Sequence, residues 1–175
     1  MTHEELGKTI YSTSHLTGTF VLRSGTVSNE YFDKYLFESN PKLLVEIAKK
    51  LVDLLPDDFD VIAGLEMGGI PLATALSILT EKPLALVRKK AKEYGTMKIA
   101  EGAEIKGKRV VIIEDVVTSG GQVVLSAEDL RKQGAEVTIA LCVIDRESGG
   151  KNDLAQIGIK LRAIYTMTEL KSLNN

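Results

Sequence analysis

The segment Glu114–Gln122 carries the residues best suited to chemistry, because it joins two acidic residues to a turn rich in hydroxyl groups and glycine. It follows the apolar run 109–113 and precedes a helical pattern, so we expect it to connect a buried strand to a helix. Backbone N–H groups at such a helix start bind anions, and glycine lets a phosphate approach the chain closely. Ser119 and Gln122 also have capping-box spacing, which is the purely structural alternative for Ser119.

Glu114 and Asp115 need a separate explanation, because carboxylates repel phosphate. They can accept hydrogen bonds from a sugar diol, or hold Mg2+ through water. A phosphate site, a diol site and a metal ion together describe a phosphorylated ribose. The alternative is a pair of acids that simply end the strand in solvent. We favour the functional interpretation because a Thr-Ser-Gly-Gly turn follows two residues later.

A second turn from strand to helix is expected at Leu65–Pro71, after the apolar run 61–64. Its adjacent glycines leave backbone N–H groups open to another anion, although a packing turn is the alternative. Two such turns in one sheet fit a substrate with two separated phosphate groups. Glycines and a proline also interrupt the apolar stretch 61–80, so we expect a strand, a turn and a helix there and no membrane span.

Cations follow two further predicted strands. Four of them within residues 88–92 begin a long polar stretch. We expect residues 89–108 to form a mobile loop that can close over a polyanion; a solvated charged face is the alternative. Arg146 follows the apolar run 137–144 and can clamp a carboxylate through two hydrogen bonds. An ion-pair network with its acidic neighbours is the alternative for Arg146.

Composition narrows the class of protein. The 175 residues are 44% apolar and 26% charged, as in one folded domain. A formal net charge of −2 argues against general binding of nucleic acid. The single cysteine, Cys142, is expected to be a buried hydrophobe in a reducing, cytoplasmic protein, and residues 1–8 have no signal-peptide core. With only His3 and His15 and no matching motif, a hydrolase triad or zinc site is not expected.

Apolar runs and helical patterns alternate along most of the chain. This alternation predicts an α/β fold with a central, mostly parallel sheet flanked by helices. Ligands of such sheets bind beyond the carboxyl ends of the strands, where all the segments above fall. Strands are expected at 19–22, 30–35, 61–64, 84–88, 109–113, 137–144 and 161–165, and helices at 2–13, 40–56, 69–79, 120–133 and after Thr166.

The run Val111–Gly121, with the sequence VIIEDVVTSGG, is similar to the phosphoribosyl-diphosphate motif of type I phosphoribosyltransferases. More narrowly, the chain resembles the orotate branch of that family in its compact archaeal form, from about Gly18 to Tyr165. The resemblance implies the type I phosphoribosyltransferase fold in a single domain, 1–175, with residues 1–36 as a small N-terminal hood. The other segments that carry it are 18–25 and 31–33 (base-covering segment), 88–95 (catalytic loop) and 145–146 (base-binding turn).

The resemblance implies transfer of a phosphoribosyl group from 5-phosphoribosyl 1-diphosphate to orotate. The products would be orotidine 5'-phosphate and pyrophosphate, in pyrimidine biosynthesis, with Mg2+ held by the substrate and by Asp115 or water. Glu114, Asp115 and Lys92 would be the catalytic residues. The implied donor-binding residues are Glu66, Met67, Gly68, Gly69, Arg88, Lys89, Lys92, Tyr94, Glu114, Asp115, Val116, Val117, Thr118, Ser119, Gly120, Gly121 and Gln122. The implied orotate-binding residues are Arg23, Tyr31, Phe32, Thr118 and Arg146.

Three residues depart from the family pattern. Arg23 stands where many members have lysine, Gly68 where bacterial members have a lysine that contacts pyrophosphate, and Tyr94 where a loop histidine is usual. A neutral phenol cannot be the same general acid near neutral pH, so we expect that Lys92 is the acid or that none is needed. Family members also often have a cis non-proline peptide in the turn around Glu66–Met67.

The family further implies a homodimer in which part of the 88–108 loop serves the neighbouring site. Two alternatives to the orotate reaction stay open. One is a phosphoribosyltransferase for a purine or uracil, and Arg146 argues against it because only orotate carries a carboxylate. The other is a regulator that keeps the fold and binds a nucleotide, RNA or DNA without turnover. The intact cationic loop argues against this second alternative.

Overall fold

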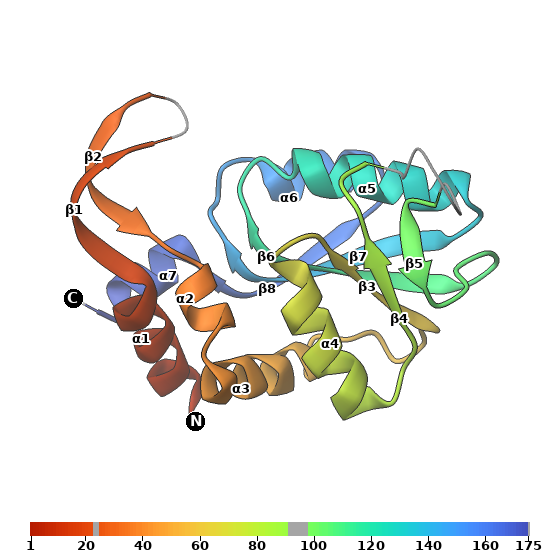
Figure 1. Cartoon of the computed structure of the whole chain (residues 1–175), viewed down its shortest axis with the longest axis horizontal. Helices are drawn as coiled ribbons and strands as arrows, with labels where there is room; N and C mark the ends of the chain where they lie inside the picture. Colours follow the sequence, from red (N-terminus) through yellow and green to blue (C-terminus); the bar gives the residue numbers. More distant parts are fainter. Residues whose placement is uncertain (23–24, 91–97, 175) are drawn as a thin grey trace.

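A six-stranded sheet forms the centre of the molecule (Figure 1). The computed structural model describes residues 1–22, 25–90 and 98–174. In the described part of this six-stranded sheet only β5 runs antiparallel to its neighbour, so the predicted α/β class and mostly parallel sheet are confirmed. The strand order is β5-β4-β3-β6-β7-β8, with β3 (Val61–Leu65), β4 (Leu84–Val87), β5 (Ala100–Gly102), β6 (Arg109–Val117), β7 (Glu136–Asp145) and β8 (Lys160–Thr166).

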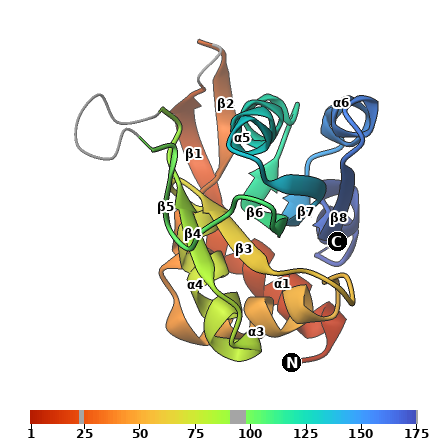
Figure 2. The same cartoon turned by 90° about the vertical axis from the view of Figure 1, so that its right-hand side faces the viewer.

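Helices cover both faces of this sheet, and Figure 2 shows the layers from the side. One apolar core contains side chains of α1 (His3–Ser14), α2 (Tyr35–Glu38), α3 (Pro41–Val52), α4 (Gly69–Thr80) and α7 (Met167–Ser172). The opposite core contains those of α5 (Gly121–Lys132) and α6 (Gly150–Gln156). No helix in the described ranges is long and apolar enough to cross a membrane.

The central strand β6 explains why its sequence is continuously apolar. Val111 and Ile113 pack into the core with α3 and α4, whereas Val110 and Ile112 pack into the core with α5. Successive strand residues point to opposite faces, so a strand covered on both faces has no polar side to display. Burial on both faces therefore accounts for the pattern that predicted a parallel sheet.

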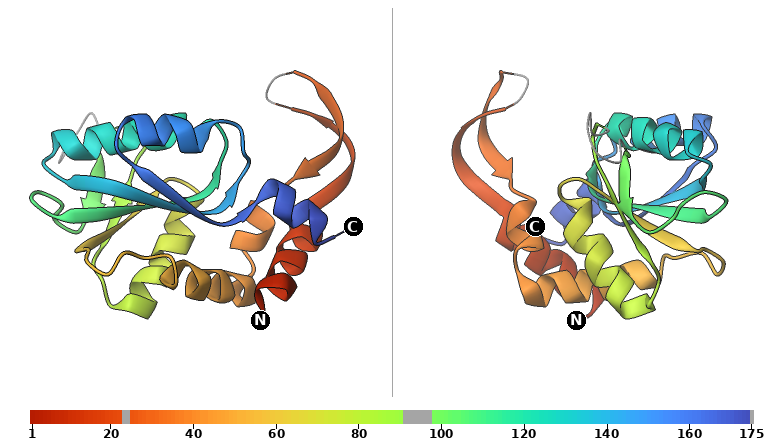
Figure 3. Two further views of the ribbon diagram at one scale, coloured as in Figure 1. Left: turned by 180° about the vertical axis from the view of Figure 1, so that it is seen from behind. Right: turned by 45° about the vertical axis from the view of Figure 1, so that its right-hand side comes forward.

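The N-terminal strands form a separate two-stranded hairpin that stands away from the rest of the molecule (Figure 3). β1 (His15–Val21) pairs antiparallel with β2 (Val27–Phe32). Both predicted strands were misplaced here, since β1 begins at His15 and Tyr35 belongs to α2. Most side chains of this ribbon are at least partly exposed, so alternation of apolar residues does not mark its ends.

Several other boundaries also differ from the predictions. The predicted strand end at Ile113 is wrong, because β6 stays paired with β7 through Val117. The predicted loop 89–108 contains β5, which pairs with β4. The short helices α2 and α6 were missed, since four and seven residues leave little room for an apolar period. The predicted strand, turn and helix within 61–80 are confirmed as β3 and α4.

Candidate active site

The carboxyl ends of β6 and β7 are joined by close backbone contacts. The Arg146 N–H donates to the Val117 carbonyl over 2.9 Å, and the Gly150 N–H donates to the Thr118 carbonyl over 3.1 Å. Gly120 has a φ of +76°, and a Cβ there would lie 3.1 Å from the Cα of Gly150. The turn after β6 and the turn after β7 are thus fixed against each other, as a shared ligand edge requires.

The start of α5 has the features of an anion site. Its N-cap, Gly120, provides no side-chain cap, so the first backbone N–H groups of the helix remain open to a ligand. The capping-box alternative for Ser119 and Gln122 is wrong, since the Gln122 side-chain amide instead donates to Ser126 Oγ over 3.2 Å. Open N–H groups and the helix dipole both favour a phosphate here.

The turn after β3 lies beside the start of the cationic segment. Its Glu66–Met67 peptide bond is cis, as the family pattern predicts. The Glu66 N–H donates to the Val87 carbonyl over 2.8 Å, and Glu66 Oε1 accepts from the Lys89 N–H over 2.6 Å. A Cβ at Gly69 would overlap the carbonyl oxygen of Ile113. Glu66 and Lys89 are thus brought together, and the turn is packed tightly on β6.

Glu114 and Asp115 do not end the strand in solvent. Both lie within β6 and are buried, with 9% and 0% of their surface exposed. The Val116 N–H donates to Asp115 Oδ1 over 2.5 Å, and the Asp115 N–H donates to Glu114 Oε1 over 2.9 Å. The ammonium of Lys34 lies 2.5 Å from Asp115 Oδ2, and Glu38 is also buried nearby. We call Lys34, Glu38, Glu114 and Asp115 the Asp115 cluster.

Only part of the Asp115 cluster is charged near neutral pH. Burial and the adjacent Asp115 carboxylate raise the pKa of Glu38 to about 9 and raise that of Glu114 well above its usual value. Burial opposes the charge on Asp115, but the neighbouring Glu114 and Glu38 carboxyls and the Lys34 ammonium lower its pKa. The Asp115 carboxylate therefore carries the charge, and Lys34 balances it.

Glycine at position 68 is explained by the Asp115 cluster. A Cβ at Gly68 would overlap Asp115 Oδ2 and lie 2.7 Å from Glu38 Oε1. The φ of Gly68 is −71°, which any residue can adopt, so the constraint is close approach and not backbone conformation. A side chain at this position is incompatible with the observed placement of the Asp115 carboxylate.

Three of the predicted orotate-binding residues line one cavity of about 280 Å³. Tyr31 and Phe32 come from β2, and Arg146 from the turn after β7. Thr118, predicted with them, is not among its lining residues. The network alternative for Arg146 is not observed, because the described residues give it no ion-pair partner, whereas Glu147 accepts from the Thr168 N–H. The guanidinium is therefore available to a carboxylate ligand.

Sequence reasoning missed two members of the site. Lys34 and Glu38 come from α2, and their spacing of four residues places both on one helical face. That spacing, directly after the segment 31–33, was the available signal. The predicted residues Arg23, Lys92 and Tyr94 lie outside the described residues.

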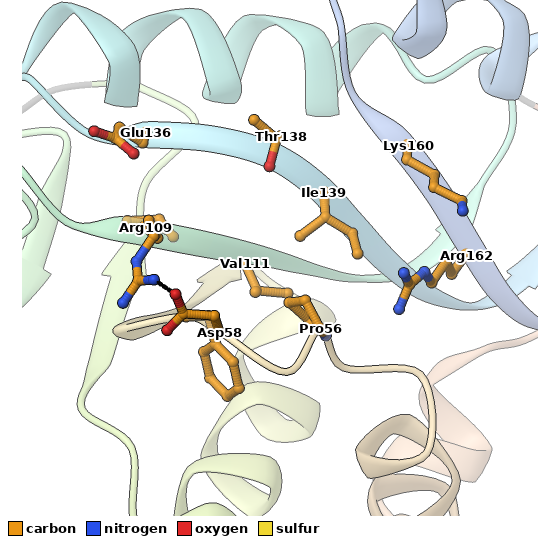
Figure 4. A pocket seen from close by; sticks show the side chains of 11 residues that line it. Pro56, Asp58, Arg109, Val111, Glu136, Thr138, Ile139, Lys160 and Arg162 are labelled. Carbon is orange, nitrogen blue, oxygen red and sulfur yellow. Dashed lines mark ion pairs between the residues drawn. The ribbon is translucent and has the colours of Figure 1, made fainter.

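A second cavity, of about 320 Å³, opens at the opposite edge of the sheet, where β6, β7 and β8 begin (Figure 4). Two of its cations already have partners. Arg109 binds Asp60 through two side-chain hydrogen bonds of 2.8 and 3.0 Å and also pairs with Asp58. Arg162 donates to the Leu54 carbonyl over 2.6 Å. These contacts tie loops to strand starts, which is a structural role.

The comparisons with known proteins agree with this geometry. A family model described as a phosphoribosyl transferase domain matches residues 37–161. An orotate phosphoribosyltransferase of Nocardioides sp. is 51% identical, with 94% of this chain and 92% of the relative covered. One from Pyrococcus horikoshii is 45% identical, with 87% and 84% covered. A crystal structure of the Mycobacterium tuberculosis enzyme superposes with a TM-score of 0.85 at 28% identity, with 96% and 98% covered.

The fold, the family match and the close relatives define the class. The chain belongs to the phosphoribosyltransferase family. Within that family it belongs to the orotate phosphoribosyltransferases.

Replacing Gly68 tests whether the Asp115 carboxylate must stay where it lies. We expect Gly68→Ala to displace Asp115 and lower kcat/KM for the sugar-phosphate donor by about 10- to 100-fold, because misplacement of a substrate-holding group by about 1 Å has such costs. Steady-state kinetics gives the value, and circular dichroism checks that the variant is folded. Unchanged kinetics would show that the carboxylate can move without loss.

Glu38→Gln tests the protonation of the Asp115 cluster. In the wild-type protein the folded state keeps the Glu38 proton up to a pH of about 9, whereas the unfolded chain loses it near pH 4.3. Between these two pH values the unfolded state binds fewer protons than the folded state. The contribution of Glu38 therefore makes the free energy of unfolding decrease as pH rises, by at most about 1.4 kcal/mol per pH unit.

The Glu38→Gln variant lacks this contribution. Its free energy of unfolding should therefore fall less steeply than that of the wild type between pH 5 and 9 (a window set by the two pKa values). Denaturant titrations across this range provide the measurement. Parallel curves for the two proteins would mean that Glu38 is already ionised when folded.

Proposed function

We propose that this protein transfers the phosphoribosyl group of 5-phosphoribosyl 1-diphosphate to orotate, as its relatives are named to do. One observation carries the proposal. The buried Asp115 carboxylate lies only a few residues before the uncapped start of α5, so that hydroxyl-binding and phosphate-binding groups adjoin. We also propose that residues 1–175 act as one unit, with 1–36 as a hood and 89–108 as a catalytic loop.

The proposed roles follow from charge and placement. The open N–H groups of α5 and the hydroxyls of Thr118 and Ser119 bind the 5-phosphate. Asp115 and Glu114 hold the ribose hydroxyls. Glu66–Gly69 and the cations Arg88, Lys89 and Lys92 face the diphosphate. The acceptor lies against Tyr31 and Phe32, with its carboxylate on Arg146. The residues that would complete donor binding are Met67, Gly68, Tyr94, Val116, Val117, Gly120, Gly121 and Gln122, and those completing acceptor binding are Arg23 and Thr118.

The chemistry needs no covalent nucleophile from the protein. Orotate N1 displaces pyrophosphate at the anomeric carbon through a transition state that resembles an oxocarbenium ion. Negative charge grows on the leaving group, so preorganised cations around it lower the barrier. The remaining contribution is to hold acceptor and donor in line and to exclude water.

Mg2+ is the proposed cofactor, and the residues present fit it. Among the described residues no group of three or more His, Cys, Asp or Glu side chains is arranged to hold a metal ion. Mg2+ commonly binds one or two carboxylates together with substrate phosphates. Asp115 Oδ2 forms an ion pair with Lys34 but no hydrogen bond of standard geometry within the described ranges, so a bound ion would be held by this carboxylate through water or after a shift of Lys34. The bound ion would add positive charge on the diphosphate.

The proposed assembly is a cytoplasmic homodimer in which the 88–108 loop of one protomer serves the site of its partner. An exposed apolar groove between α3 and α4 supports an interface. Val45, Ile78 and Leu79 line it, with 44%, 73% and 45% of their surface exposed. Exposed apolar residues gathered along one groove are typical of surfaces that bind another protein.

An activity assay separates this function from its alternatives. Wild-type protein with orotate, 5-phosphoribosyl 1-diphosphate and Mg2+ should consume orotate, as measured by its ultraviolet absorbance. Adenine, guanine, hypoxanthine and uracil should be turned over far more slowly. Turnover of one of these bases instead of orotate would support a different acceptor, and no turnover of any base would support a binding regulator.

Arg146→Met tests recognition of the orotate carboxylate. Loss of a charged hydrogen bond should raise KM for orotate by about 10- to 100-fold, while KM for the donor changes little. Lys151→Met, at an exposed position of the following helix α6, is the matched control. An unchanged KM for orotate in Arg146→Met would assign the carboxylate to another cation.

Lys92→Ala and Asp115→Asn test the shared loop. Each variant alone should turn over far more slowly than the wild type, and Lys92→Ala should lose much more turnover than ground-state binding. Mixing the two after reversible dissociation should restore activity, because a mixed dimer has one site with both an intact Asp115 and an intact partner loop. If mixing restores nothing although mixed dimers form, the loop serves its own protomer.

A further inference from the structure

The Asp115 carboxylate is fully buried, and Lys34 is the described cation that contacts it. Its Oδ2 lies 2.5 Å from Lys34 Nζ, and the Lys34 side chain is itself 33% exposed. Two more carboxyl groups, Glu38 and Glu114, are buried in the same cluster. A buried carboxylate without a counter-charge is strongly disfavoured. Lys34 is therefore placed to balance the charge of Asp115 and to hold its Oδ2 in position, while the Val116 N–H holds Oδ1.

Binding of the donor increases the need for positive charge beside the Asp115 carboxylate. It carries a phosphate and a diphosphate, and both must bind close to the acidic Asp115 cluster. An unbalanced carboxylate would repel such a polyanion. Position 68, where a Cβ would overlap Asp115 Oδ2, holds glycine and supplies no cation. Lys34 thus provides positive charge at a point where the turn after β3 provides none.

The backbone around Lys34 connects the hairpin to this site. Lys34 is the N-cap of α2 and follows Phe32, which lines the acceptor cavity, by two residues. Between them, the Asp33 N–H donates to the Ser14 carbonyl over 2.8 Å, and Asp33 Oδ1 accepts from the Tyr35 N–H over 3.1 Å. These bonds anchor the chain to the end of α1, so the ammonium reaches Asp115 from a fixed point.

We propose that Lys34 is a positioning residue that holds the Asp115 carboxylate in place for the donor's ribose hydroxyls and balances its charge when the polyanionic donor binds. This role rests on the proposed function, because it assumes a phosphoribosyl donor at Asp115. It does not depend on which base is the acceptor.

Donor binding is the direct test. Isothermal titration calorimetry with 5-phosphoribosyl 1-diphosphate and Mg2+, without acceptor, should show at least tenfold weaker binding to Lys34→Met than to the wild type. Lys34→Arg keeps the charge and should recover most of the affinity. Lys8→Met, which removes a lysine from an exposed pair with Glu4, should bind like the wild type. In steady-state kinetics, KM for the donor should rise more than kcat falls.

The Asp115→Asn background tests whether Lys34 acts by positioning Asp115 or only by attracting the donor through its own charge. If Lys34 acts through Asp115, adding Lys34→Met to Asp115→Asn should weaken donor binding further by less than threefold. This pair of variants also avoids an uncompensated buried charge, so it decides the matter if Lys34→Met alone does not fold.

Three outcomes would overturn the inference. They are wild-type affinity in folded Lys34→Met, no recovery in Lys34→Arg, and a full loss on adding Lys34→Met to Asp115→Asn. Failure of the proposed function looks different, because the wild-type protein itself would then bind no donor. Donor binding without turnover of orotate would leave the role of Lys34 intact and change only the acceptor.

Discussion

The site depends on keeping one carboxylate charged inside the protein. Asp115 is buried in the middle strand of the sheet, between two acids that keep their protons and one lysine that balances its charge. Close packing at Gly68 leaves the carboxylate no room to move toward the turn after β3. The same strand leads directly into the uncapped start of α5. Charge, packing and connectivity thus combine to place a buried carboxylate beside an uncapped helix start, which are the proposed sites for the ribose hydroxyls and the phosphate.

Close backbone contacts at glycine residues fix the positions of the turns around Asp115. The turn after β3 touches β6 at Gly69, and the turn after β6 touches the turn after β7 at Gly120 and Gly150. A Cβ at Gly69 or Gly150 would overlap backbone atoms, and at Gly120 the positive φ of +76° also disfavours a side chain. The loops at the carboxyl ends of the strands therefore form one packed layer, and a ligand there meets groups held by the sheet itself.

The sequence predicted much of the fold because most strands are covered on both faces. Continuous apolar runs and helix caps at Thr2, Asn40 and Thr166 located the elements of the body well. The hairpin was misplaced because its largely exposed ribbon has no such signal. The end of β6 was misplaced because acidic residues usually indicate a solvent-exposed end of a strand. Here Glu114 and Asp115 lie inside the strand, which stays paired with β7 as far as Val117.

The placement of candidate residues was predictable where the signal is local in the sequence, and it was missed where residues meet only through the fold. The turn after β6 and Arg146 were identified because their residue types and places at strand ends suffice. Lys34 and Glu38 were missed because their local signal, a spacing of four residues after the segment 31–33, does not show that they reach Asp115 across the fold. Gly68 was first interpreted as the loss of a cation, whereas its packing against Asp115 gives it a steric reason.

The hairpin of β1 and β2 differs from the main sheet in how easily it opens. It is a two-stranded ribbon with many exposed side chains, and its Phe32 packs against one core of the main sheet. Such ribbons open at a smaller free-energy cost than packed sheets do. Tyr31 and Phe32 belong to this ribbon, whereas Arg146 follows a strand of the main sheet. The hairpin side of this cavity can therefore open at a smaller free-energy cost than the side held by the main sheet.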